Sequence, residues 1–274
     1  MAWQMCDPWV GLQLLLLSSL VGKACAETTF MPVCQIACCD MEKHPRCKRV
    51  GCNARRCMQG DALVPCGTKE NVGGTRLTGA KVTATGGWKL LKSYNYFLDH
   101  GLVEALVNFF QHTMKPPRRT SVLELGAGMG CYTAALRAHG IDARGVDGAP
   151  GIDNLTSSLV GFANLAQPQQ LELADWVYSF EVGEHIPRRF ESNFLWNLVS
   201  HARLGLVLSW SLKSSAGRGH VNARNTTYLI ETLSRHYGLK YLAAATDTLR
   251  RAIGVTYWIG DSIMVFKKVQ KQSH

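Results

Sequence analysis

The chain has 274 residues, of which 46% are hydrophobic and 18% are charged. This length allows one large domain or two small ones, and the composition argues against intrinsic disorder and against a polytopic membrane protein. The formal net charge of +10 is spread along the chain in small clusters, as on a solvated basic surface, although it would also suit an acidic partner. The sequence contains no recognisable nucleic-acid-binding motif.

Residues 1–26 are predicted to be a signal peptide. Residues 10–22 form an apolar stretch, and Ala24-Cys25-Ala26 follows as a small-x-small cleavage signature. The stretch is shorter than the about 20 apolar residues of a membrane-spanning helix, so no transmembrane segment is expected after cleavage. The mature protein is therefore expected in the secretory-pathway lumen or outside the cell. Because no Lys or Arg precedes the apolar stretch, a signal anchor or a misread start stays open.

Residues 27–66 are predicted to form a cysteine-rich module. Seven of the ten cysteines lie there, at Cys34, Cys38, Cys39, Cys47, Cys52, Cys57 and Cys66. Such density after a signal peptide predicts a disulfide framework. A zinc knuckle is the alternative, disfavoured because no pair has C-x-x-C spacing. Seven is an odd number, which leaves one thiol free or paired elsewhere.

The rest of the chain divides into a linker and a main domain. Residues 67–87 are rich in Gly and Thr without apolar periodicity, which predicts a linker. In the main domain, residues 88–274, the patterns predict helices over 97–110, 132–139, 190–202 and 228–237, and strands over 121–125, 143–147, 159–165, 176–180, 205–210, 240–245 and 262–267. This alternation predicts an α/β fold with a doubly wound, mostly parallel, seven-stranded sheet. The last two strands have no predicted helix between them, which favours an antiparallel hairpin.

Three glycines come directly after the first predicted strand, at Gly126, Gly128 and Gly130. The carboxyl end of a strand is where open α/β sheets bind ligands. Glycines allow a tight turn and close approach of a ligand to the backbone, and the following helix offers N–H donors. The spacing differs from the dinucleotide fingerprint, whose third glycine comes one residue later.

With the acid that precedes them, these glycines form Glu124-Leu-Gly-Ala-Gly-Met-Gly. The string resembles motif I of class I, Rossmann-like methyltransferases that use S-adenosylmethionine (SAM), and the resemblance covers about residues 121–267. It implies methyl transfer from SAM to an acceptor, a small molecule or a protein, that the sequence does not identify. It also implies that Glu124 lies beside the methionine part of SAM, and that the glycines pack against the cofactor.

The resemblance assigns two further polar residues to the cofactor. Asp147, at the end of the second predicted strand, matches the acid that holds the ribose hydroxyls, because two carboxylate oxygens can accept two O–H donors. An ordinary Asp-Gly surface turn is the alternative. The family often has Asp after strand three to hold the adenine amino group. The best match in this chain is Asn164, whose carbonyl oxygen can still accept that hydrogen bond.

After the fourth predicted strand comes Glu181-Val-Gly-Glu184-His185-Ile-Pro187. It resembles an E-V-x-E-H-x-P segment of small-molecule methyltransferases, including ubiquinone-biosynthesis O-methyltransferases, which places Glu181, Glu184 and His185 at the methyl-transfer end. They could hold a divalent cation, His185 could act alone as a base, or the residues could only shape the pocket. Glu181 is also expected beside the cofactor. His220, after strand five, is expected on the same rim as a contact of the acceptor, or else as a surface-loop residue.

Two other functions stay open. One is a secreted binding protein that kept the fold without catalysis, and the other is an NAD-type oxidoreductase, which Gly130 and the terminal hairpin disfavour. In the secretory route Asn154 and Asn225 would be glycosylation acceptors, because each begins an N-x-T triplet. Asn154 lies soon after Asp147, where a glycan would obstruct the cofactor site, so Asn225 is the better candidate. The sequence does not indicate an oligomeric state.

Overall fold

The structure is a computed structural model. It describes residues 56–59, 62–65, 82–88, 98–113, 119–212, 219–254 and 256–269. The predicted signal peptide, most of the cysteine-rich module and most of the linker lie outside these residues. Within the module, β1 (Arg56–Gln59) and β2 (Ala62–Pro65) pair antiparallel. None of the helices in the described residues has the length and apolar character of a membrane span.

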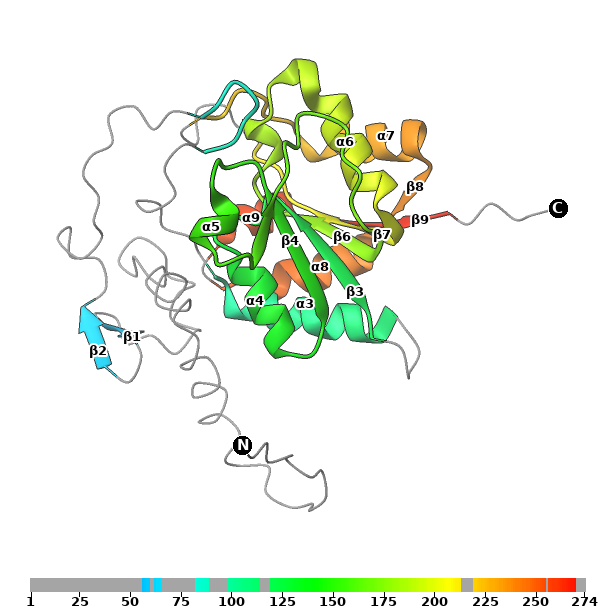
Figure 1. Ribbon diagram of the computed structural model, residues 1–274. Coiled ribbons are helices and arrows are strands. Elements are labelled where there is room, and N and C mark those ends of the chain that lie inside the picture. The colour runs from blue at the N-terminus through cyan, green and yellow to red at the C-terminus, as the bar shows by residue number, and fades with distance from the viewer. Residues whose placement is uncertain are drawn as a thin grey trace.

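A seven-stranded sheet forms the centre of the main domain (Figure 1). In spatial order its strands are β5 (Val160–Phe162), β4 (Asp142–Asp147), β3 (Ser121–Leu125), β6 (Ala174–Ser179), β7 (Ala202–Leu208), β9 (Met264–Lys268) and β8 (Leu239–Tyr241). From β5 to β7 each neighbouring pair is parallel, whereas β9 is antiparallel to both β7 and β8. The chain winds outward from β3 to β5 and then returns to β6. This confirms the predicted doubly wound α/β sheet with an antiparallel C-terminal strand.

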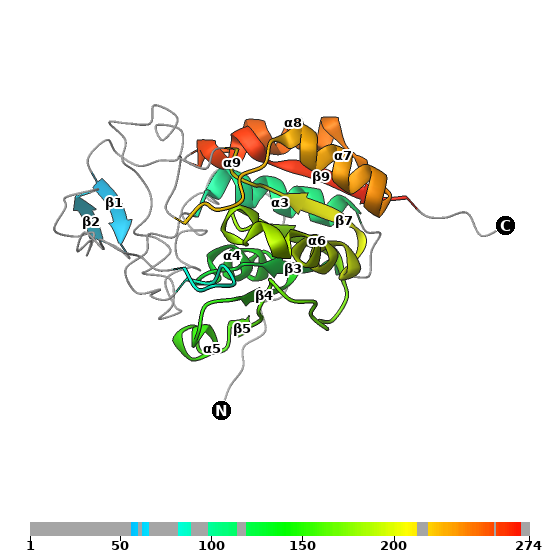
Figure 2. The same ribbon diagram turned by 90° about the horizontal axis from the view of Figure 1, so that it is seen from above.

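Helices cover both faces of the sheet (Figures 1 and 2). On one face pack α3 (His100–Thr113), α4 (Cys131–Ala138), α8 (Ala243–Ala252) and α9 (Tyr257–Ser262), and on the other pack α6 (Glu191–Ser200) and α7 (Thr226–Tyr237). The short α5 (Ile152–Leu155) connects β4 to β5, and the 3₁₀ turns η2 (Gly183–His185) and η3 (Arg188–Phe190) precede α6. The arrangement is the three-layer α/β architecture in which both faces of a parallel sheet are buried.

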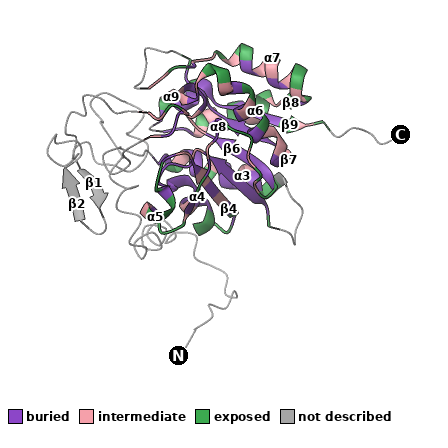
Figure 3. Ribbon diagram, turned by 45° about the horizontal axis from the view of Figure 1, so that its top comes forward, coloured by how far each residue is buried: buried purple, intermediate pink, exposed green. Residues whose placement is uncertain are grey.

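The central strands are apolar because they are buried on both faces (Figure 3). Successive side chains of a strand point to opposite faces. In β6, Trp176 and Tyr178 join the core under α3, whereas Val177 joins the core under α6. All three are at most 2% exposed. This continuous burial holds the carboxyl ends of β3 and β6 in fixed positions beside each other.

The connection between the last two strands differs from the prediction. The antiparallel pairing is confirmed, but α8 and α9 lie between β8 and β9, where the sequence had predicted no helix and a strand running to residue 245. Only Thr246 and Leu249 of α8 are fully buried, and the helix has few large apolar residues that would mark it in the sequence. Packing of α8 against α3, together with several strong helix formers, decides the conformation.

Candidate functional site

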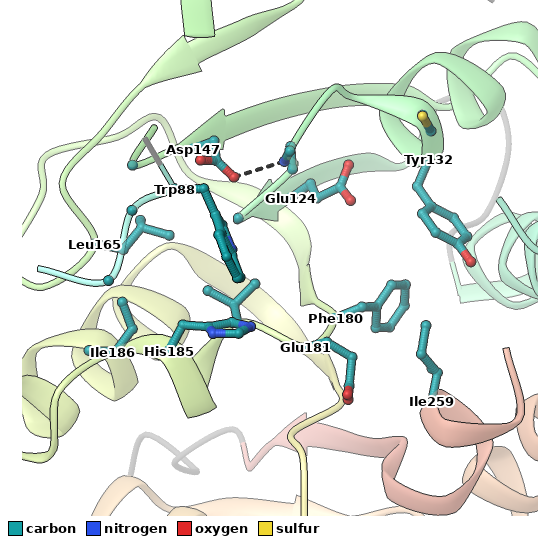
Figure 4. A pocket seen from close by; sticks show the side chains of 18 of the residues that line it. Trp88, Glu124, Tyr132, Asp147, Leu165, Phe180, Glu181, His185, Ile186 and Ile259 are labelled. Carbon is teal, nitrogen blue, oxygen red and sulfur yellow. Dashed lines mark hydrogen bonds between the residues drawn. The ribbon is translucent and has the colours of Figure 1, made fainter. Parts of the chain in front are cut away.

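A cavity of about 280 Å³ lies at the carboxyl edge of the sheet, enclosed by the loops after β3, β4, β5 and β6. Helix α9 and residues 85–88 complete its wall. Doubly wound sheets bind ligands at this edge, where the strand order reverses. The volume is close to the lower end of the range for ligand pockets, about 300–1,000 Å³. Figure 4 shows the labelled side chains around this pocket.

The glycine loop after β3 forms one wall of the pocket through Gly126 and Gly128. Gly126 has φ +83°, and a Cβ there would lie 2.2 Å from Val182 Cγ2. Only glycine fits this turn, because the backbone is left-handed and the loop after β6 packs directly on it. Gly130, the third predicted cofactor residue, does not line the pocket; it precedes α4 with φ +77°. The left-handed turn into α4 therefore explains why a glycine stands at position 130.

Asp147 ends β4 and lines the pocket, as predicted. Its Oδ2 accepts a hydrogen bond from the Gly128 N–H (2.8 Å), and its Oδ1 accepts one from the Ala149 N–H (2.8 Å). These two bonds fix the carboxylate while each oxygen keeps a second lone pair for a ligand. Burial raises the pKa of Asp147, and the two backbone hydrogen bonds oppose this rise. The residue therefore both shapes the glycine loop and presents two acceptors to the cavity.

Glu124 lies on β3 at the floor of the pocket and is only 4% exposed. Its Oε2 accepts hydrogen bonds from the Thr133 N–H (3.1 Å), the Thr133 hydroxyl (2.6 Å) and the Tyr178 hydroxyl (2.9 Å). Burial nevertheless raises the pKa of Glu124 to about 7. A cationic ligand beside a buried carboxyl with a pKa near 7 would stabilise its ionised form, so the site favours a cation. Since Oε2 is engaged, Oε1 is the oxygen available to such a ligand.

Asn164 follows β5 but does not line the pocket; its neighbour Leu165 does. The Asn164 side chain accepts a hydrogen bond from the Ala166 N–H (3.2 Å), which shapes the local turn.

Glu181 directly follows Phe180 at the end of β6 and lines the pocket. Its φ is +56°, a strained value for a residue with a side chain. The conformation is held by hydrogen bonds that its Oε1 accepts from the Ser209 hydroxyl (2.9 Å) and the Ser262 hydroxyl (3.2 Å). Burial raises the pKa of Glu181. These hydrogen bonds hold the side chain against the residue that follows β7 and against the end of α9.

The structure brings Glu184, His185 and His220 together, with one possible ligand atom of each within 4.8 Å of the others. The Nε2 atoms of His185 and His220 lie 4.0 and 3.9 Å from Glu184 Oε1. Glu184 is fully buried, and burial followed by the charge of Glu181 raises its pKa well above the ordinary value. Glu184 and His185 of the predicted trio belong to this cluster, and Glu181 acts on Glu184 through its charge.

The loop that carries His220 is held against η2 by the main chain. The N–H groups of Val221 and Asn222 both donate to the Glu184 carbonyl, at 2.8 and 2.9 Å. Glu191 of α6 accepts hydrogen bonds from the side chains of Asn222 (2.9 Å) and Arg224 (2.7 Å). The same set of hydrogen bonds therefore fixes the positions of Glu184 and of the loop that carries His220.

Residues 82–88 contribute to the site although the sequence analysis assigned 67–87 to a linker. A Cβ on Gly87 would lie 2.2 Å from the Gly148 carbonyl oxygen, so this turn packs directly on the loop after β4. The ring of Trp88 lies edge-on to that of His185, with centroids 5.0 Å apart (Figure 4). A Gly-Gly-Trp string beside the domain boundary is the only local signal that could have indicated this role.

The far wall of the pocket is aromatic and apolar, and sequence reasoning did not find it. Tyr132, Phe180, Trp258 and Ile259 line it, and the rings of Tyr132 and Phe180 meet edge-on at 5.5 Å. Three of these residues come from helices α4 and α9, whose pocket-facing residues have no sequence signature of their own. The cavity thus has a polar side at Asp147 and an apolar side that excludes water.

No protein-family model matches the sequence, and the search of curated proteins gives no match. Among solved structures, the chain is similar to magnesium protoporphyrin IX methyltransferase from Synechocystis PCC 6803 with bound SAH (17% identity, 61% of this chain and 81% of that chain, TM-score 0.46). It is also similar to the glycopeptide N-methyltransferase MtfA (13%, 63% and 91%, 0.43) and to TehB from Haemophilus influenzae (16%, 65% and 65%, 0.42). Similarity this low carries no activity over to this chain.

Proposed function

We propose that this protein transfers a methyl group from SAM to an acceptor. The observation that carries the proposal is one pocket, at the switch point of the sheet, that combines the left-handed glycine loop, Asp147 and Glu124. These residues are among those that the motif resemblance assigns to SAM, and Glu124, Gly126, Gly128 and Asp147 line a single cavity. The proposal thus rests on site chemistry as well as on fold.

The donor set of the pocket fits the groups of SAM. Asp147 presents two fixed carboxylate oxygens to the cavity, which suits a pair of ribose hydroxyls. Glu124 offers a buried carboxyl to the cationic methionine end, and the apolar wall at Phe180 suits the uncharged parts of the molecule. The loop also lacks the later third glycine that a dinucleotide fingerprint requires, which disfavours NAD.

Bound SAM supplies an electrophilic methyl group, so the protein needs no covalent nucleophile. The residues around the pocket contribute alignment and exclude water from the reacting groups. His185 lies on one side of the cavity and Glu124 and Asp147 lie on another, and the ring of Trp88 extends from beside Asp147 toward His185 (Figure 4). This separation leaves the side with His185 for the acceptor.

Two routes could activate an acceptor hydroxyl or amine. A divalent cation would lower its pKa, or His185 would accept its proton directly. Burial lowers the pKa of His185 to about 4, so the ring is neutral at pH 7 but a weak proton acceptor.

We place the reaction in the secretory-pathway lumen or outside the cell. This part of the proposal rests on the leader at 1–26 and on the cysteines that follow it. With Cys131, the mature chain has eight cysteines, an even number that would allow complete pairing. Asn225 is exposed at the start of α7, as a glycosylation acceptor needs to be.

The cofactor assignment is tested by Asp147→Ala, with Asp142→Ala as the control because Asp142 is exposed at the opposite end of β4. Losing hydrogen bonds to a charged group costs about 1.5–3 kcal/mol, which is roughly a tenfold to hundredfold loss of SAM affinity. Calorimetric titration measures the affinity, and thermal melting confirms that both variants fold. Equal SAM affinity in a folded Asp147→Ala variant and in the wild type would rule out this cofactor site.

A further inference from the structure

Residues 82–88 form a compact turn with hydrogen bonds of its own. Val82 and Trp88 pair as an antiparallel bridge at its base. Inside the turn, the Thr83 N–H donates to the Gly87 carbonyl (2.6 Å), and the Gly87 N–H donates to the Thr83 hydroxyl (2.9 Å). Because these bonds are made within the turn, they keep its shape without help from the sheet or from a helix.

The turn spans the pocket from the side of the cofactor acid to the side of His185. At one end Gly87 packs on the Gly148 carbonyl, in the loop after β4. At the other end a Cβ on Gly86 would lie 2.8 Å from the His185 carbonyl oxygen. Residues 85–88 line the cavity between these two contacts. The turn therefore bridges the two sides of the pocket that the proposed reaction has to bring together.

Three contacts of the turn converge on His185. Gly86 packs on its carbonyl, and the Trp88 ring lies edge-on to its imidazole with centroids 5.0 Å apart. A Cβ on Gly219 would lie 2.5 Å from Val82 Cγ2, so Val82 packs on Gly219. The Gly219 carbonyl oxygen in turn lies 3.2 Å from His185 Nδ1. The position of this histidine therefore depends on the position of the turn.

The contacts that join the turn to the pocket rim are of a kind that can be broken and remade. They are van der Waals and ring contacts, each of which contributes little alone, whereas the hydrogen bonds of Thr83 and Gly87 lie inside the turn. A segment of this construction can leave the pocket and return as one piece, as active-site lids do.

We propose that residues 82–88 form a strap that closes the pocket over bound SAM and opens to exchange it, with Trp88 as the side chain that covers the cofactor. This inference rests on the proposed function, because it takes SAM as the occupant of the pocket. The Trp88 ring extends from beside Asp147 toward His185 (Figure 4), so the closed strap shields the reacting groups from water. Since the strap also holds His185, its closure arranges the acceptor side at the same time.

The test measures the rate at which SAM leaves the full-length protein, by stopped-flow displacement, in the wild type, Trp88→Ala and Gly87→Ala. The Cβ added at Gly87 would lie 2.2 Å from the Gly148 carbonyl oxygen, so it pushes the strap off the loop after β4. Both variants are expected to release SAM roughly tenfold faster, because the loss of contacts to a bound ligand appears mainly in its dissociation rate. Trp88→Phe keeps a ring and should restore most of the slow release.

Two control variants carry the same changes elsewhere in the domain. Trp196→Ala removes an indole that is 42% exposed on α6. Gly161→Ala adds a methyl group whose nearest contact is an ordinary 3.6 Å. Both controls should release SAM at the wild-type rate, and thermal melting shows which variants are folded. Should Gly87→Ala fail to fold, Trp88→Ala decides the test.

Limited digestion with trypsin reports closure without a rate of SAM release. Trypsin cleaves after Lys81 and Lys89, which directly flank the strap in the sequence. Saturating SAM should slow cleavage at both sites several-fold, because it favours the closed strap. Cleavage after Arg119 should not change, since this exposed residue precedes β3 at the end of the strand away from the pocket. In Trp88→Ala the protection by SAM should be lost.

The outcomes separate this inference from the proposed function. If the wild type binds SAM but folded Trp88→Ala releases it at the wild-type rate, the strap does not cover the cofactor. Cleavage at Lys81 and Lys89 that SAM does not slow would overturn the inference equally. If the wild type does not bind SAM, the proposed function is wrong, and the inference falls with it.

Discussion

The raised pKa of Glu124 leads to a prediction that can be tested without a substrate. Burial raises its pKa to about 7 even though Thr133 and Tyr178 donate hydrogen bonds to it, and the charge of Asp147 on the neighbouring strand raises it further. Among the described residues, Tyr132 from α4 also interacts electrostatically with Glu124, and burial is the main cause of its own raised pKa. Glu124 therefore stays largely protonated in the ligand-free protein up to nearly neutral pH.

The sign of the effect on stability follows from the two protonation states. Between pH 4.5, the ordinary pKa, and about 7, the folded protein holds a proton that the unfolded chain releases. The corresponding stability is present below pH 4.5 and is lost as the pH rises to about 7 and above. The interval is worth about 3 kcal/mol, or roughly 6–12 °C in melting temperature for a domain of this size.

Glu124→Gln removes this dependence, because glutamine does not ionise and its oxygen can accept the same hydrogen bonds. In thermal melts without ligand at pH 4.5, 6 and 8, the melting temperature of the variant should rise relative to that of the wild type as the pH rises. Glu104→Gln is the control, since Glu104 is exposed on α3. If the difference in melting temperature between Glu124→Gln and the wild type is constant from pH 4.5 to 8, the account of this buried carboxyl is wrong.

Two further predictions concern packing and compartment. A Cβ on Gly183 would lie 2.3 Å from the Trp210 ring, whereas one on Gly161 would make ordinary contacts at 3.6 Å, so Gly183→Ala should lower the free energy of unfolding by about 1–3 kcal/mol and Gly161→Ala much less. Denaturant melts that rank the two variants equally would contradict this. Intact mass spectrometry of the native protein should give a chain beginning near Glu27 with few free thiols among residues 34–66. An intact leader with fully reduced cysteines would refute the secretory proposal.

The parts of the site that the sequence predicted are those with strong local signals. The strand at Ser121–Leu125 is a short apolar run that ends in a glycine loop, and its bounds agree with β3. Asp147 could be placed because it ends the next predicted strand, 143–147. In both cases the residues that define the feature are neighbours in the sequence, so spacing alone identifies them.

The parts that the sequence did not predict depend on contacts between distant residues. His220 was expected on the same rim, but its approach to Glu184, 36 positions away in the sequence, depends on hydrogen bonds of a loop that has no periodicity. Residues 82–88 reach the pocket because their glycines pack on the loop after β4. From its composition alone, this segment was predicted to be part of a linker. The aromatic wall from α4 and α9 likewise forms only when both helices pack on one face of the sheet.

The central claim, that the pocket holds SAM, is tested most directly by calorimetric titration of the full-length protein with SAM and, separately, with NAD⁺. The account predicts saturable binding of one SAM per chain, and no measurable binding of NAD⁺ at the same concentrations. Binding of NAD⁺ with no binding of SAM would contradict it and favour an oxidoreductase. Binding of neither ligand would also contradict it, and would leave a binding protein that kept the fold without the cofactor.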